Sequence, residues 1–222
     1  LAYKGYLVEN FKPQTVNLRL QAINKYLEFI KQDKLKLRFI KVQQKNFLEN
    51  VISNADYKFL KSSLLNDGYK DWYFIVWFMT ATGSRVSELL QIKAEHVQIG
   101  HLDLYTKGGK MRRIYIPKTL QKEALQWLQE RQISTGYIFL NRFGERITTR
   151  GIAMQLKHFA DKYGLKREVV YPHSFRHRYA KNFLDRFNDI ALLADLMGHE
   201  SIETTRIYLR RTASEQRQIV DK

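Results

Sequence analysis

The sequence contains no cysteine, so it can form neither disulfide bonds nor thiolate metal sites. No apolar run is long enough to cross a bilayer, and the first residues do not form a signal peptide. We therefore expect a cytoplasmic protein without a membrane partner. The chain begins at Leu1 rather than Met, from which we expect that upstream residues have been removed. Paired carboxylates at metal-ligand spacing, HExxH and a P-loop are also missing, so we expect no metal and no other cofactor.

Acidic residues are scarce relative to basic ones. Lys and Arg number 38 and Asp and Glu 22, which gives a formal net charge of +16. Residues 1–53 and the remainder are each net basic. Lysine and arginine contacts to phosphates release counterions and supply affinity that does not depend on sequence. The charge favours a nucleic-acid partner over the alternative of a merely solvated basic surface.

Residues 1–50 form the first predicted unit, a partial helical domain followed by a basic linker. Apolar residues recur at helical spacing over 3–31, and Pro13 divides a short helix from a longer one with Thr15 as a plausible N-cap. Residues 34–39 alternate charged and apolar side chains, as an extended strand or linker does. We predict DNA contacts from this basic stretch at Lys36, Arg38 and Lys41.

Residues 51–222 form the second predicted unit, which is mainly α-helical with a small antiparallel β-sheet (α+β). Ser53 to Asp56 resembles a capping box for a helix that ends at Gly68, and Asp71 is predicted to cap a buried helix over 72–80. A short helix is predicted over 85–90. A hairpin is predicted from the alternating runs 102–106 and 111–116. Further helices are predicted at 118–132, 148–163, 173–186, 189–197 and 201–209.

Five side chains form a set suited to attack on a phosphodiester: Arg85, His173, Arg176, His199 and Tyr208. Such attack places negative charge on the non-bridging oxygens, and the planar guanidinium grips two oxygens while staying protonated. His173 and Arg176 are three residues apart, so on a helix both face one side. A phenol is a weak nucleophile near neutral pH, and nearby arginines are expected to favour its phenolate.

Each feature alone has an ordinary structural explanation. One helical arginine is usually at the surface, HxxR is a weak signal, and a histidine after Gly198 is often only a turn residue. The chain also holds 13 tyrosines, most of which we expect to be packing residues. We interpret His177 as such a packing residue. It is the combination that carries the prediction, together with the string from Leu196 to Tyr208.

The order, spacing and flanking residues of this set resemble the tyrosine recombinases, the phage-integrase family that includes Xer-like and mobile-element integrases. The resemblance implies a site-specific recombinase or integrase that cuts and rejoins double-stranded DNA through a 3′-phosphotyrosine, without metal or ATP. It implies that Tyr208 is the nucleophile, that Arg85, His173, Arg176 and His199 hold the phosphate, and that Glu88 braces the site. It also implies a homo-tetramer on paired recombination sites. The amino-terminal part is shorter than the family's helical core-binding domain.

The leaving 5′-oxygen needs a proton, and the resemblance implies Lys107 as its source. Lys110 is the alternative acid. We also predict DNA contacts at Lys110, Arg112 and Arg178. Two other functions stay open at this point: a type IB topoisomerase, which uses the same chemistry to relax DNA, and a catalytically idle DNA-binding regulator.

Overall fold

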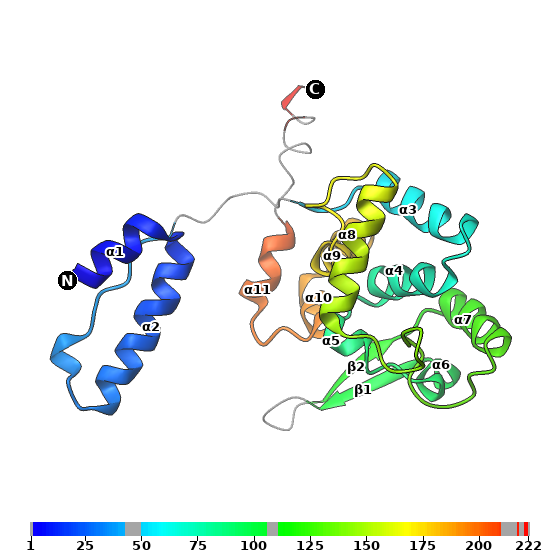
Figure 1. Cartoon of the computed structure of the whole chain (residues 1–222), viewed down its shortest axis with the longest axis horizontal. Coiled ribbons are helices and arrows are strands. Elements are labelled where there is room, and N and C mark those ends of the chain that lie inside the picture. Colours follow the sequence, from blue (N-terminus) through cyan, green and yellow to red (C-terminus); the bar gives the residue numbers. More distant parts are fainter. Residues whose placement is uncertain (1, 43–49, 106–110, 210–216, 218–219, 222) are drawn as a thin grey trace. The chain divides into compact units, whose positions relative to one another are not determined.

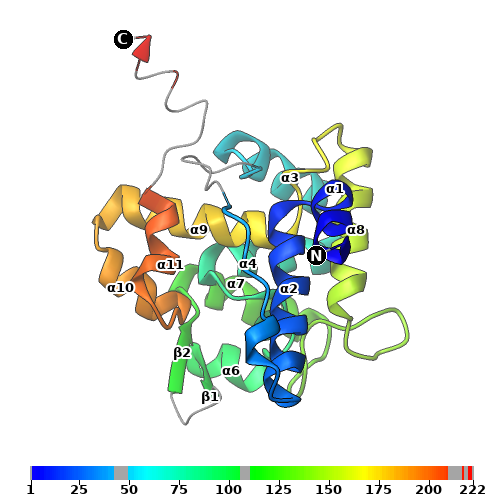
Figure 2. The ribbon, with the colours of Figure 1, turned by 90° about the vertical axis from the view of Figure 1, so that its left-hand side faces the viewer.

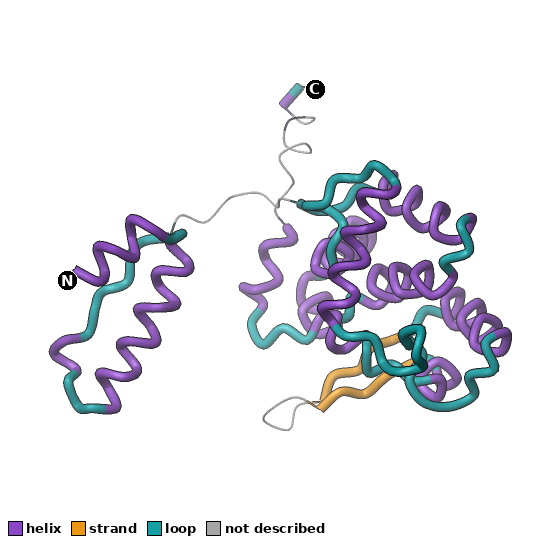
Figure 3. Tube along the Cα trace, viewed as in Figure 1, coloured by secondary structure: helices purple, strands orange, loops and turns teal. Residues whose placement is uncertain are grey.

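The computed structural model describes residues 2–42, 50–105, 111–209, 217 and 220–221. The chain folds as two compact units, Leu1–Asn46 and Phe47–Lys222. Helices account for most of the described residues, and a single hairpin supplies the strands (Figures 1 and 3). This agrees with the predicted fold class. Within the described ranges, no helix is both long and apolar enough to span a membrane.

The amino-terminal unit contains α1 (Ala2–Asn10), α2 (Pro13–Phe29) and the 3₁₀ turn η1 (Asp33–Leu35). Its small core consists of Leu7, Val16 and Leu20. Two asparagines of α2 hold the segment that follows η1. Asn17 exchanges two hydrogen bonds of 2.9 Å with the backbone of Ile40, and Asn24 exchanges two of 2.9 and 2.8 Å with the backbone of Leu37.

One local expectation for this unit was wrong, and one of the two alternatives for another is excluded. Lys12, not Thr15, is the N-cap of α2, because Pro13 occupies the first helical turn, where its missing N–H costs no hydrogen bond. Residues 36–42 form no strand. Their backbone pairs with asparagine side chains, so the alternation over 34–39 reflects docking onto a helix and not membership of a sheet.

The second unit begins with a helical layer built around a buried helix. Ser53 Oγ accepts the Asp56 N–H at 3.0 Å and caps α3 (Asn54–Asn66), as predicted. α4 (Lys70–Thr82) is buried on most faces and packs against α3, α7 (Lys118–Glu130) and α9 (Pro172–Phe187). This central position explains why its sequence is apolar nearly all round.

The remaining described elements of the unit are α5 (Val86–Leu89), α6 (Ala94–Ile99), β1 (His101–Tyr105), β2 (Met111–Tyr115), α8 (Thr149–Lys162), α10 (Ile190–Met197), α11 (Ile202–Arg206) and the 3₁₀ turn η2 (Ile207–Leu209). The strands pair antiparallel, with His101 opposite Tyr115 and Leu104 opposite Arg112. α10 and α11 lie against each other beside α9 (Figure 2). The helix predicted over 201–209 is thus a five-residue helix followed by a 3₁₀ turn.

Asp71 does not cap α4. The helix begins at Lys70, one residue before it, and the Asp71 carboxylate instead accepts a hydrogen bond from Trp127 Nε1 at 3.1 Å and pairs with Arg131 at 3.0 Å. α6 was not predicted at all. At its start, the backbone N–H of Lys93 donates to the ring Nδ1 of His96 at 3.0 Å. Histidine is not among the residues that usually cap helix N-termini.

Candidate active site

Arg85 lies where the chain leaves the buried helix α4. α4 ends at Gly83, which has φ +60°, and a Cβ there would fall 2.3 Å from Cδ1 of Tyr179. Only glycine combines this left-handed backbone with such close packing. Arg85 is then the N-cap of α5, and Glu88 Oε2 accepts its backbone N–H at 2.7 Å. The start of α5 therefore fixes the arginine backbone.

The carboxylate of Glu88 contacts two arginine side chains. Its Oε1 accepts hydrogen bonds from Arg85 Nη1 at 2.7 Å and from Arg112 Nη1 at 2.6 Å. Burial alone raises the pKa of Glu88, but the charge of Arg112 and hydrogen bonds from Arg85 and Arg112 outweigh it, so the pKa is lowered. The carboxylate is ionised and does not carry a proton for transfer.

Arg176 is buried at 4% exposure on α9. Its Nη1 donates to Gly83 O, and its Nη2 donates to Met197 O at 2.8 Å and to His199 Nε2 at 3.1 Å. Burial, together with the charges of Arg85 and Arg112, lowers the pKa of Arg176 to about 10, so the side chain stays charged at neutral pH. Its side chain bridges the ends of α4 and α10.

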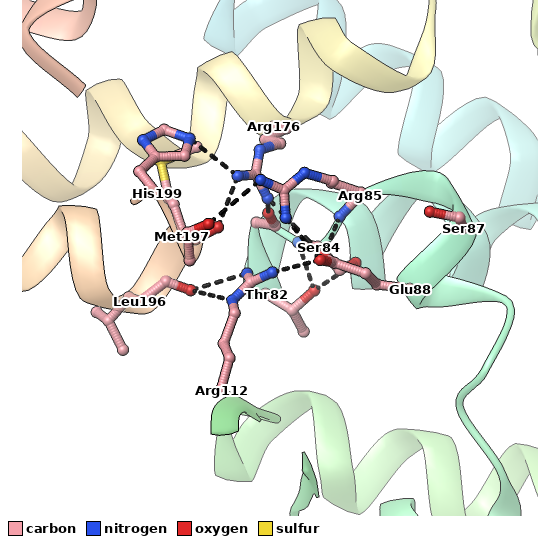
Figure 4. A network of polar contacts seen from close by, with 12 residues as sticks. Thr82, Ser84, Arg85, Ser87, Glu88, Arg112, Arg176, Leu196, Met197 and His199 are labelled. Carbon is pink, nitrogen blue, oxygen red and sulfur yellow. Dashed lines mark hydrogen bonds and ion pairs between the residues drawn. The ribbon is translucent and has the colours of Figure 1, made fainter. Parts of the chain in front are cut away.

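Three consecutive carbonyl groups at the end of α10 each accept a hydrogen bond from a different arginine (Figure 4). Leu196 O accepts from Arg112 at 2.8 Å, Met197 O from Arg176 at 2.8 Å, and Gly198 O from Arg85 at 3.3 Å. The last carbonyls of a helix lack partners within the helix and carry its negative dipole end. They hold three guanidinium groups close together.

Arg112 was predicted to contact DNA, but its side chain is buried. Its side chain is 7% exposed, and its three guanidinium nitrogens are engaged by Glu88 Oε1 and Leu196 O. Successive side chains of β2 point to opposite faces of the hairpin, so Arg112 lies on the same buried face as Ile114. The Arg112 side chain thus links β2 to α5 and to the end of α10.

His199 follows the left-handed Gly198, and its backbone N–H donates to Ala194 O at 3.0 Å in a Schellman-type helix end. Its ring Nδ1 lies 2.7 Å from Thr205 Oγ1 and its Nε2 3.1 Å from Arg176 Nη2. Burial and the charges of Arg176, Arg85 and Arg112 lower the pKa of His199 to about 4. The imidazole is therefore neutral near pH 7.

Tyr208 lies in η2 with only 6% of its surface exposed, and η2 packs against α9. Its hydroxyl oxygen is 3.2 Å from Nδ1 of His177, and its ring stacks with His199 at 6.3 Å between centroids. Burial raises the pKa of Tyr208, although Arg176 and Arg85 act in the opposite direction. The arginines favour the phenolate, as expected, but desolvation is the larger effect and the pKa is raised overall.

His177 is the site residue that the sequence interpretation missed, since it was assigned to packing alone. It is half-buried on α9, and burial together with His173 and Arg176 lowers its pKa to about 4. Its position four residues after His173 is the signal that was available, because side chains at that spacing share a helix face. His173 itself is exposed in the first turn of α9.

The remaining predicted contacts fall into three groups. Lys107 and Lys110 lie outside the described residues. Arg38 and Lys41 are exposed, whereas Lys36 pairs with Asp33 at 2.5 Å and Glu28 at 3.4 Å, which reduces the charge it presents. Arg178 is half-buried on α9. Across the described ranges, no three His, Asp or Glu side chains come close enough together to hold a metal ion.

The geometry suits a tetrahedral anion. Arg176 donates to the neutral carbonyls of Gly83 and Met197. Arg85 donates to Gly198 O as well as to the Glu88 carboxylate. A phosphate oxygen is a stronger, charge-assisted acceptor than a carbonyl. A phenol and two neutral imidazoles lie at the edge of the same pocket. These side chains come together from α5, α9, β2, the end of α10 and η2.

The chain is similar in sequence to known proteins over most of its length. The phage integrase family profile matches residues 47–215. The tyrosine recombinase XerA of Pyrococcus furiosus is 32% identical, over 100% of this chain and 77% of its own length. XerD of Listeria innocua is 33% identical over 60% of this chain and 47% of its own length.

Solved structures show the same fold. A crystal structure of XerA recombinase has a TM-score of 0.66 at 22% identity, covering 98% of this chain and 79% of that one. XerH recombinase bound to a palindromic difH substrate has a TM-score of 0.76 at 20% identity, covering 99% and 70%.

Proposed function

Because this chain belongs to the phage integrase family, we propose that it is a site-specific DNA recombinase of the tyrosine type. Its substrate is double-stranded DNA carrying recombination sites. One strand is cut by a tyrosine, which keeps the 3′-phosphate as an ester, and the free 5′-hydroxyl of another strand later displaces the tyrosine. No bond energy is lost between the two steps, so neither step requires ATP.

The observation that carries the proposal is the position of Tyr208 beside the cationic pocket. Its hydroxyl oxygen lies 3.2 Å from Nδ1 of His177, the residue that follows Arg176 on α9. Its ring stacks with His199, which Arg176 contacts at 3.1 Å. A packing tyrosine chosen from elsewhere in the core has no reason to meet this condition. We assign Tyr208 as the nucleophile on this ground.

The other roles follow from what each side chain can donate. Arg85 and Arg176 bind the non-bridging oxygens, where negative charge grows in the transition state. Glu88 and Arg112 hold Arg85 and the α10 end in place. His199 and His173 supply hydrogen-bond donors to the phosphate or the nucleophile. We keep Lys107 as the proposed general acid, with Lys110 as its alternative.

The proposal extends to assembly and location. We propose that residues 1–50 and 51–222 act as a partial core-binding domain and a catalytic domain, that exposed Arg38 and Lys41 follow the phosphate backbone, and that the active form is a tetramer on two paired sites. A substrate of double-stranded DNA also agrees with a cytoplasmic location.

A trapping experiment tests the function. The protein is incubated with nicked duplexes of randomised sequence. Cleavage releases the short fragment that bears the new 5′-hydroxyl, so the covalent complex cannot be religated. We expect denaturant-resistant adducts with the wild-type chain and none with Tyr208→Phe, and sequencing the trapped duplexes defines the site. An idle DNA-binding regulator gives no adduct. A type IB topoisomerase relaxes a supercoiled plasmid that lacks the selected site, whereas we expect no relaxation there.

A further inference from the structure

The hydrogen bonds of His199 determine which of its ring nitrogens carries the proton. Arg176 Nη2 has two N–H groups and no lone pair, and one of them points at His199 Nε2 over 3.1 Å. Nε2 must therefore accept. In a neutral imidazole the proton then lies on Nδ1, which donates to Thr205 Oγ1 at 2.7 Å.

This tautomer is the wrong one for the role proposed for His199. Nε2 is the ring nitrogen that faces Arg176 and hence the phosphate pocket. To donate to a phosphate oxygen, Nε2 must carry the proton and Nδ1 must become an acceptor. The partner of Nδ1 then has to change from acceptor to donor. An imidazolium would avoid the exchange, but burial and three neighbouring arginines lower the pKa of His199 to about 4.

The hydroxyl of Thr205 can change from acceptor to donor while its oxygen stays in place. A hydroxyl accepts through its lone pairs or donates after rotation about one bond. Thr205 is 0% exposed, so water cannot readily replace its hydroxyl as the partner. Carboxylate and guanidinium groups are excluded in this role, since one only accepts and the other only donates.

We propose that Thr205 is a positioning residue that sets the tautomer of His199, holding Nδ1–H in the free enzyme and donating to Nδ1 once DNA is bound. On binding, Arg176 turns its N–H from Nε2 to the phosphate. One proton leaves Nδ1 for water and one arrives at Nε2 from water, through the accessible part of the half-exposed ring, so the imidazole stays neutral. This inference rests on the proposed function, because it needs a phosphate in the pocket.

A double-mutant cycle tests the inference on a duplex selected in the trapping experiment. Thr205→Val keeps the shape and removes the hydroxyl, and Thr205→Ser keeps the hydroxyl. We expect single-turnover adduct formation to slow roughly tenfold or more in Thr205→Val, the cost of leaving a buried polar group unpaired. Thr205→Ser should recover it to within about threefold. In a His199→Phe background, Thr205→Val should cause no further loss.

Three results would overturn the inference while leaving the function intact: wild-type rates in Thr205→Val, no recovery in Thr205→Ser, or the same loss in both backgrounds, which is what a purely structural threonine gives. Imidazole ¹⁵N spectra provide a second readout, with His199 assigned by its absence from His199→Phe. We expect the Nδ1–H tautomer in free Tyr208→Phe protein and the Nε2–H tautomer in its complex with the selected duplex. One tautomer in both states contradicts the inference. Failure of the wild-type chain to form any adduct instead removes the proposed function, and the inference with it.

Discussion

The hydroxyl oxygen of Tyr208 lies 3.2 Å from Nδ1 of His177. His177 is neutral near pH 7, since burial lowers its pKa to about 4, and a neutral Nδ1 can accept the phenolic proton. A phenol that donates to His177 keeps its oxygen lone pairs directed elsewhere. The contact therefore orients the phenol of the proposed nucleophile and does not deprotonate it.

His177→Phe should consequently slow adduct formation about tenfold, the usual cost of losing one such hydrogen bond and its orientation, without weakening DNA binding. His177→Asn, which can place an amide oxygen near the same point, should recover part of the rate. His158→Phe, at an exposed position on α8, is the matched control. Single-turnover cleavage and fluorescence anisotropy separate the two effects, and an unaltered cleavage rate in His177→Phe would return His177 to the packing role.

The two neutral histidines predict how stability depends on pH. The pKa values of His177 and His199 fall from 6.5 to about 4 on folding, so between these values the unfolded chain binds protons that the folded chain does not. Stability is then fully present above about pH 6.5 and is lost as the pH falls toward 4. Thermal unfolding across this window should show a smaller decline in the His177→Phe, His199→Phe double variant. Parallel curves for both proteins would contradict the lowered pKa values.

Gly198 should tolerate no side chain, for two reasons that a control can separate. It has φ +63°, and a Cβ would fall 2.3 Å from Arg112 Cδ. Gly164 has φ +66° and open space around it. Gly164→Ala should cost only the left-handed backbone strain, about 1–2 kcal/mol. Gly198→Ala should cost a further 1–3 kcal/mol or so from overpacking and should also impair cleavage. Equal losses of unfolding free energy in the two variants would show that the Arg112 side chain can move aside at no cost and would contradict this prediction.

Arg112 offers a test of bracing against DNA contact. Arg112→Lys keeps the charge but cannot reproduce the contacts of the three guanidinium nitrogens with Glu88 and Leu196. We expect reduced stability and slower cleavage, with an unchanged salt dependence of DNA affinity. Lys41→Ala, at an exposed predicted phosphate contact, should reduce the slope of log affinity against log salt by about 1. A comparable slope change in Arg112→Ala would restore it as a DNA contact.

Much of this fold could be predicted because its signals are local. Ser53 and Gly68 mark the ends of α3, and alternation marks both strands of the hairpin. The missed α6 is capped by a histidine ring, a contact that depends on geometry and not on residue preference.

The site was harder to predict where its chemistry depends on burial. Alternation along β2 already placed Arg112 beside Ile114 on the inner face, yet its charge favoured a surface role. The rise in the pKa of Tyr208 could not be predicted, because desolvation depends on neighbours from α9 and from the end of α10.

Mapping the DNA-linked residue tests the central claim most directly. Adducts trapped on a selected duplex are digested with protease and nuclease, and the peptide that keeps a nucleotide is sequenced by mass spectrometry. We predict a single modified peptide, with the phosphate esterified to the phenolic oxygen of Tyr208. A nucleotide attached to any other side chain, or an equal yield of adduct from Tyr208→Phe, would contradict the account.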